Sequence, residues 1–245
     1  MTRLKRMGTL YLVRHAQASF LEGNYDKLSA LGETQARLLG KDWARRQLLF
    51  SRACMGPRIR HRDTATLVAG EYKHDGLHCP DPQVFEEFDE YPGERVLERS
   101  LPQLIDRDQR VRELHVAFQR ASERTQQRIA FQKLFEVVIG EWMRGAIRLE
   151  GVETWIAFCA RVNSGLTRFL GGGSSGERVV IFTSGGPIAI AMQRALQLSP
   201  ESTLQVSWMS RNSSWSKFLY SKSRFTLSSF NSHGHIEDSA MLTHR

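Results

Sequence analysis

Residues 9–15 read TLYLVRH, an apolar run that ends in a cation and an imidazole. An apolar run bounded by polar residues predicts a strand that is buried on both faces of a sheet. Arg14 and His15 would then lie at the carboxyl end of this strand, where open α/β sheets bind ligands. A second run, residues 178–182, opens into residues 183–186, TSGG. We therefore expect two loops that are far apart in the sequence to converge on one pocket.

Extended and helical patterns alternate along the rest of the chain. Strands are expected at residues 9–13, 52–55, 84–85 and 178–182, helices at 31–48, 60–72, 152–170 and 187–198, and a hairpin at 215–220 and 224–230. This alternation predicts a mostly parallel sheet that is covered by helices on both faces. The expected fold class is α/β, as a three-layer α/β/α sandwich with a helical insertion.

The insertion is expected at about residues 92–150, inside a single domain that spans residues 1–245. Its sequence is rich in arginine and shows helical patterns without a strand signal. Arg120, Arg124 and Arg128 recur at a spacing of four residues, which predicts a cationic stripe along one helix face.

Composition and charge narrow the class of function. The net charge of +8 favours anionic partners. Three cysteines without a CxxC pair indicate neither a disulfide framework nor a zinc site. No apolar run is long enough to span a bilayer, and the basic start lacks the apolar core of a signal peptide, so we expect a cytoplasmic protein. Arginines interleaved with aromatic residues are absent from the predicted strands, which disfavours nucleic-acid binding.

Arg14 and His15 combine two side chains that suit phosphate chemistry. A guanidinium group offers a planar fork of donors that matches phosphate oxygens. An imidazole can act as a general base, a metal ligand or a nucleophile, and the pair alone leaves these roles open.

Further motifs follow in one order along nearly the whole chain. They are residues 11–19 (YLVRHAQAS), 26–29 (DKLS) with Gly32 and Gln35-Ala36, 56–60 (GPRIR) with Thr64-Ala65, 85–89 (FEEFD), 151–153 (GVE) with Phe158 and Arg161-Val162, 180–188 (VIFTSGGPI), and Phe230-Asn231 with His235-Ile236. Together they resemble the histidine phosphatase superfamily, in its phosphoglycerate mutase-like branch.

The resemblance implies a role for each matching residue. His15 would be the nucleophile that accepts the phosphoryl group, and Arg14 and Arg60 would bind phosphate. The segment that begins at Phe85 would supply the proton donor, for which the pattern favours Glu87. Glu86 is the alternative, because a slip of one residue swaps the face of an extended segment. No metal or other cofactor is implied.

Ser184 departs from the family pattern, in which a second catalytic histidine precedes the two glycines. A serine hydroxyl donates one hydrogen bond but carries no charge. We expect Ser184 and Gly185 to contact the phosphate, together with backbone N–H groups at the start of the next helix. His233 and His235 both fall in the predicted last strand, so neither is expected to refill the position.

The resemblance therefore predicts a phosphatase that hydrolyses a phosphomonoester through a phosphohistidine. The run typical of the mutases is replaced by residues 88–93, FDEYPG, which makes a phosphoglycerate mutase less favoured. A module that binds phosphate ligands with weak or no turnover is the alternative, because of Ser184. The expected partner is a phosphorylated small molecule or a phosphoprotein, and neither nucleic acid nor a membrane.

Overall fold

The computed structural model describes residues 7–19, 26–172 and 176–244. They divide into two units. The sheet unit comprises the described residues up to Glu90 and from Arg161 onwards, and the helical unit comprises Tyr91–Ala160. Within the described ranges, no helix combines the length and the apolarity needed to cross a membrane.

In the described part of the chain, six strands form one sheet in the order β3-β2-β4-β1-β5-β6. Their bounds are β1 (Gly8–Arg14), β2 (Arg52–Met55), β3 (Gln83–Val84), β4 (Arg178–Thr183), β5 (Trp215–Tyr220) and β6 (Phe225–Ser232). The pairs β3-β2, β2-β4 and β4-β1 are parallel. The pairs β1-β5 and β5-β6 are antiparallel, and β5 and β6 form the predicted hairpin.

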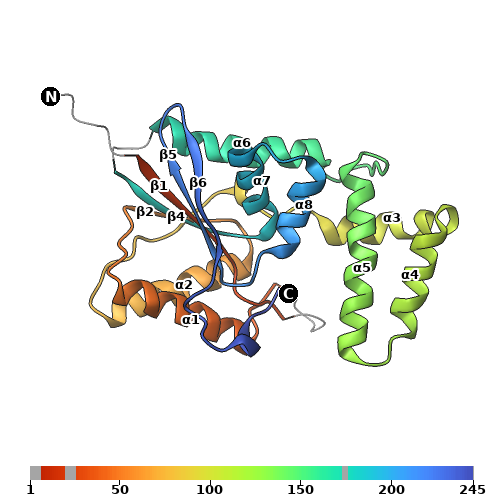
Figure 1. Ribbon diagram of the computed structural model, residues 1–245, viewed down its shortest axis with the longest axis horizontal. Coiled ribbons are helices and arrows are strands. Elements are labelled where there is room, and N and C mark those ends of the chain that lie inside the picture. Colours follow the sequence, from red (N-terminus) through yellow and green to blue (C-terminus); the bar gives the residue numbers. More distant parts are fainter. Residues whose placement is uncertain (1–6, 20–25, 173–175, 245) are drawn as a thin grey trace. The chain divides into compact units, whose positions relative to one another are not determined.

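Helices cover both faces of this sheet. Figure 1 shows α1 (Ala30–Arg45) and α2 (Ile59–His74) on one side, and α6 (Trp155–Gly172) and α7 (Gly185–Leu196) on the other. Because side chains alternate along a strand, Tyr11 and Val13 of β1 pack into the core beneath α1 and α2, whereas Leu10 and Leu12 are buried on the opposite face. The predicted α/β fold, a mostly parallel sheet flanked by helices with a helical insertion, is confirmed.

Two features near the end of the chain differ from expectation. An additional helix, α8 (Pro200–Met209), begins at Ser199, whose side chain accepts a hydrogen bond from the Ser202 N–H, with proline in its first turn. In addition, β6 ends at Ser232, so His233 and His235 lie after the last strand rather than within it.

The helical unit contains α3 (Gly93–Arg107), α4 (Gln109–Arg120) and α5 (Arg124–Met143), followed by the start of α6. The prediction of one arginine stripe is wrong, because α4 ends at Arg120 and α5 begins at Arg124. The backbone is extended at Ala121 and Glu123, so the three arginines are divided between two helices.

The strand ends bring distant segments together in the sheet unit. Arg14 at the end of β1 is the register partner of Thr183 at the end of β4, and Met55 at the end of β2 pairs with Phe182. The His15 N–H then donates to the Thr183 carbonyl at 2.8 Å. The residues after these three strands therefore share one edge of the sheet, which the sequence predicts for the loops after β1 and β4.

Candidate active site

His15 lies buried at this edge, with 6% of its surface exposed. Its Nδ1 atom is 2.8 Å from the Ala16 carbonyl. Since a carbonyl only accepts, Nδ1 carries the hydrogen, and Nε2 of the neutral ring keeps its lone pair. Burial, followed by the positive charges of Arg60 and Arg14, lowers the pKa of His15 well below its usual range. At neutral pH the side chain is thus an uncharged imidazole that keeps a lone pair on Nε2.

Arg14 and Arg60 both lie close enough to act electrostatically on His15. The buried Arg60 donates from Nη1 to Oδ1 of Asp26 at 2.9 Å, and Oδ2 of Asp26 accepts the Ile59 N–H at 2.8 Å. Asp26 therefore fixes both the Arg60 side chain and the start of α2.

Arg14 is held by backbone carbonyls from a later part of the chain. Its Nη2 atom donates to the His244 carbonyl at 2.6 Å, and its Nη1 atom donates to the Ser210 carbonyl. The structure thus brings the predicted phosphate arginines beside His15, each oriented by an acceptor from another segment.

Ser184 is fully buried between β4 and α7, and its partner is a histidine that the sequence does not predict for the site. The Ser184 Oγ atom is 2.7 Å from Nε2 of His61. His61 is itself fully buried, and its ring centroid is 5.8 Å from that of His15. Burial and the charges of Arg60 and Arg58 lower the pKa of His61 well below its usual range. Its position directly after Arg60 is the one sequence signal that could have indicated it.

Gly56 leaves the space that the His61 ring occupies. A Cβ atom at position 56 would lie 2.5 Å from Nδ1 of His61 and 2.5 Å from the Phe88 carbonyl oxygen. Gly185 has a comparable role one residue after Ser184, because a Cβ there would lie 2.9 Å from the Ser207 carbonyl oxygen of α8. Glycine at both positions allows the backbone and side chains around Ser184 to approach closely.

Three glutamates follow β3, and the structure directs them differently. Glu86 is exposed. The Glu87 carboxylate pairs with Arg168 of α6. Glu90, which was not expected from the sequence, directs Oε2 to the Gly186 N–H in the first turn of α7 at 3.2 Å. The carboxylate next to Ser184 along α7 is therefore that of Glu90.

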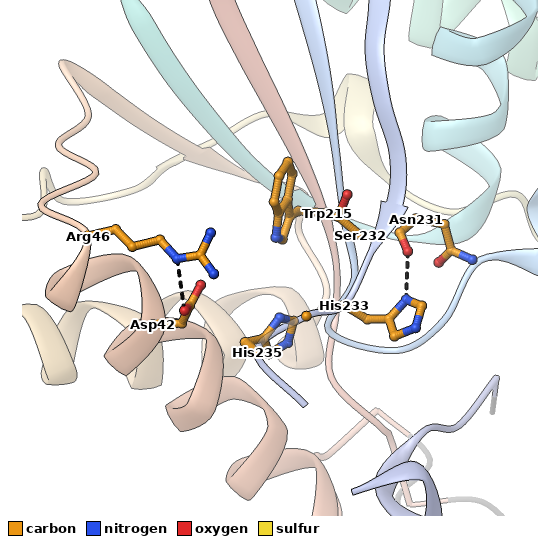
Figure 2. Close-up of a pocket in the computed structure, with 8 residues that line it drawn as sticks. Asp42, Arg46, Trp215, Asn231, Ser232, His233 and His235 are labelled. Atoms are coloured by element: carbon orange, nitrogen blue, oxygen red, sulfur yellow. Dashed lines mark hydrogen bonds and ion pairs between the residues drawn. The ribbon is translucent and has the colours of Figure 1, made fainter. Parts of the chain in front are cut away.

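A separate cavity of about 310 Å³ opens near β6. Figure 2 shows the residues around it, which are Asp42, Arg46, Trp215, Asn231, Ser232, His233, Gly234 and His235. His235 is linked to the His15 segment through Ser213, whose Oγ is 3.0 Å from Nε2 of His235 and whose N–H donates to the His15 carbonyl at 3.2 Å. His233 and His235 therefore line this cavity, and Ser213 contacts both the His235 ring and the His15 carbonyl.

The fold has counterparts among solved structures. A phosphoglycerate mutase from Bacillus anthracis is 15% identical, with a TM-score of 0.61 over 94% of this chain and 96% of that one. A phosphoserine phosphatase from Entamoeba histolytica in complex with phosphoserine is 18% identical, with a TM-score of 0.61 over 94% and 100%. A mycobacterial glucosyl-3-phosphoglycerate phosphatase with inorganic phosphate is 18% identical, with a TM-score of 0.55 over 94% and 99%. At these identities the similarity shows the fold.

The family itself is shown by the sequence. No curated protein sequence matches the chain. The profile of the family described as "Histidine phosphatase superfamily (branch 1)" matches residues 94–233, which is more than half of the chain. The chain therefore belongs to branch 1 of the histidine phosphatase superfamily, the phosphoglycerate mutase-like branch.

Proposed function

We propose that this protein is a phosphatase that hydrolyses a phosphomonoester through a phosphohistidine on His15. The observation that carries the proposal is the state of His15. Its ring is neutral, its Nδ1 hydrogen is committed to the Ala16 carbonyl, and two arginines lie beside it. A nucleophilic histidine needs a free lone pair on one nitrogen and a fixed ring orientation, and both are met here.

In the first step, Nε2 of His15 attacks phosphorus in line with the leaving oxygen. The new P–N bond forms as the P–O bond breaks, and a carboxylic acid gives its proton to the leaving alkoxide. Arg14 and Arg60 stabilise charge on the equatorial oxygens. The positive charge that develops on the ring is stabilised by the hydrogen bond from Nδ1 to the Ala16 carbonyl.

In the second step, water attacks the phosphohistidine. The carboxylate formed in the first step removes the proton of the water, the P–N bond breaks, and inorganic phosphate leaves a neutral His15. Glu87 is the proton donor that the family resemblance favours, and Glu90 is the one favoured by its position beside α7. Each carboxylate is a candidate for both proton transfers.

The proposed substrate is a phosphorylated small molecule or a phosphoprotein, and no cofactor takes part. A phosphatase is preferred to a mutase because residues 88–93 replace the mutase run. Phosphate binding without turnover is the competing function, since Ser184 brings no charge to the phosphoryl group.

The test compares the wild type with His15→Ala and with His74→Ala, a control on α2 whose side chain is 82% exposed. On p-nitrophenyl phosphate and a metabolite panel, we expect His15→Ala to lower kcat by ~10³ or more and His74→Ala to leave it unchanged. Rapid-quench labelling should trap an acid-labile phosphate on the wild type. Turnover without bound phosphate would exclude the covalent route, and phosphate binding without turnover would favour the binding module.

A further inference from the structure

Two buried imidazoles lie side by side in the site, and the proposed reaction uses one of them. His61 has its Nε2 atom 2.7 Å from the Ser184 hydroxyl oxygen, and neither residue exposes any surface. Burying two polar side chains is unfavourable unless they are hydrogen-bonded to each other or to a ligand. The hydrogen of this bond therefore comes either from the Ser184 hydroxyl or from Nε2 of His61.

A count of hydrogens limits the choices. The serine hydroxyl has one hydrogen, and a neutral imidazole has one N–H, on Nδ1 or on Nε2. If Ser184 donates to His61, its oxygen presents lone pairs to its surroundings and repels an anion. If His61 donates from Nε2, the hydroxyl hydrogen is available to another acceptor.

A phosphoryl group bound at His15 would decide between these arrangements. Hydrogen bonds to an ionised oxygen are roughly twice as strong as those between neutral groups. The phosphoryl oxygen therefore takes the hydroxyl hydrogen in preference to a neutral ring nitrogen, and Nε2 of His61 becomes the donor to Ser184. Because its lowered pKa keeps the ring neutral, His61 reaches this state by moving its hydrogen from Nδ1 to Nε2.

We propose that His61 is a positioning residue that orients the Ser184 hydroxyl as a hydrogen-bond donor to the phosphoryl group. The two side chains together then supply the interaction that a histidine at position 184 would supply alone. This inference rests on the proposed function, because it requires a phosphoryl group beside His15. Gly56 supports it, since any larger residue would displace the His61 ring from its place against Ser184.

Two variants of His61 separate orientation from packing. His61→Gln keeps a side-chain amide that can donate to Ser184, whereas His61→Leu fills similar space without a donor. We expect His61→Leu to lower kcat ~10- to 100-fold with a smaller change in KM, and His61→Gln to retain most of the activity. Ser184→Ala should resemble His61→Leu, and the double variant should be no worse than either, because the two residues act as one unit. Equal activity of His61→Leu and the wild type would overturn the proposal.

An exchange of positions gives a second test. His61→Ala makes room for a ring, and Ser184→His places one directly at the end of β4. The combined variant should recover kcat relative to His61→Ala alone. The exchange variant could instead stay as inactive as His61→Ala while its melting temperature matches that of the wild type. The proposal that Ser184 and His61 together replace a histidine at position 184 would then be wrong.

A spectroscopic readout does not depend on turnover. In ¹⁵N-histidine NMR spectra of the full chain saturated with inorganic phosphate, with His61 assigned from His61→Gln, Nε2 of His61 should carry the hydrogen. In Ser184→Ala this preference should be lost. A lone pair on Nε2 at saturation would overturn the proposal even if His15 proves to be the nucleophile. Loss of turnover in His15→Ala tests the proposed function separately.

Discussion

Glu90 directs its carboxylate to the first turn of α7, two residues after Ser184, whereas Arg168 holds the Glu87 carboxylate. A general acid must reach the leaving oxygen, so the geometry favours Glu90. We expect Glu90→Gln to lower kcat ~10²-fold or more for an alkyl phosphate and much less for p-nitrophenyl phosphate, whose leaving group needs no proton. Glu87→Gln should affect both substrates alike. If Glu87→Gln shows the selective loss instead, the assignment from the family pattern is the right one.

Among the site residues, the sequence predicts those that directly follow a strand. It does not predict those that reach the site only through a contact with a distant segment. Arg14, His15 and Ser184 follow from two apolar runs and the parallel sheet that they imply. His61 meets Ser184 across 123 positions of the chain, and no spacing encodes such a pair. Glu90 is likewise identified by the hydrogen bond that it accepts from the Gly186 N–H. Apart from the family pattern, Glu86, Glu87 and Glu90 are equally good candidates for a proton donor in the sequence.

Helix α2, which carries Arg60 and His61, packs closely against α1. A Cβ atom at Gly40 of α1 would lie 2.8 Å from the Val68 carbonyl oxygen of α2. We expect Gly40→Ala to push the helices apart, to lower the free energy of unfolding by ~1–3 kcal/mol and to reduce kcat. Urea unfolding and the aryl phosphate assay measure the two effects.

Gly70 provides the matched control on α2. It is exposed, and an added Cβ atom would meet nothing within 4 Å. Gly70→Ala should raise the free energy of unfolding by ~0.5–1 kcal/mol, because alanine is the better helix former, and kcat should not change. A loss of stability in both variants would show that the close helix contact is not the cause.

Helices and strands follow from the sequence where local signals agree with packing. Residues 52–55 were expected as a strand and form β2 with the same bounds. The break between α4 and α5 could not be predicted, because residues 121–123 contain neither glycine nor proline. The two helices on either side of it pack against each other, which is a tertiary contact that local propensity does not reveal.

Buried neutral histidines make the whole molecule sensitive to acid. His15 and His61 have pKa values well below the usual range, and burial lowers the pKa of His235 to about 4. In the unfolded chain each histidine titrates near about 6.5, so below that pH the unfolded state binds more protons than the folded state. The contribution of these histidines to stability should therefore be constant above about pH 6.5 and fall as the pH is lowered through that value.

For His235 the loss is about 1.4 kcal/mol for each pH unit below about 6.5 and ends near its folded pKa, at about 3 kcal/mol. Urea unfolding at pH 7.5 and at pH 5 measures it. His235→Gln, which can still bond to Ser213, should reduce the pH dependence, and His74→Gln on the surface should not. Identical dependence in His235→Gln and the wild type would contradict the lowered pKa.

The fold class is predictable from the sequence because alternating strands and helices admit few arrangements. The boundary between the sheet unit and the helical unit is less predictable from the sequence. The helical unit extends to Ala160, beyond the expected end of the insertion at about 150. The reason is that α6 is one continuous helix, and no local signal marks the residue at which its contacts change from one unit to the other.

The bond between Arg14 and the His244 carbonyl joins residues that are 230 positions apart. At a synthesis rate of 5–20 residues per second, about 10–50 s pass between the two leaving the ribosome. For the first 164 residues of that interval, from Arg14 to the start of β4 at Arg178, β1 has neither of its partner strands β4 and β5 and exposes an apolar strand. The proposed phosphate site thus acquires its full set of contacts to Arg14 only after His244 has emerged. The yield of the protein in cells should therefore depend on chaperones that shield the first strand during translation.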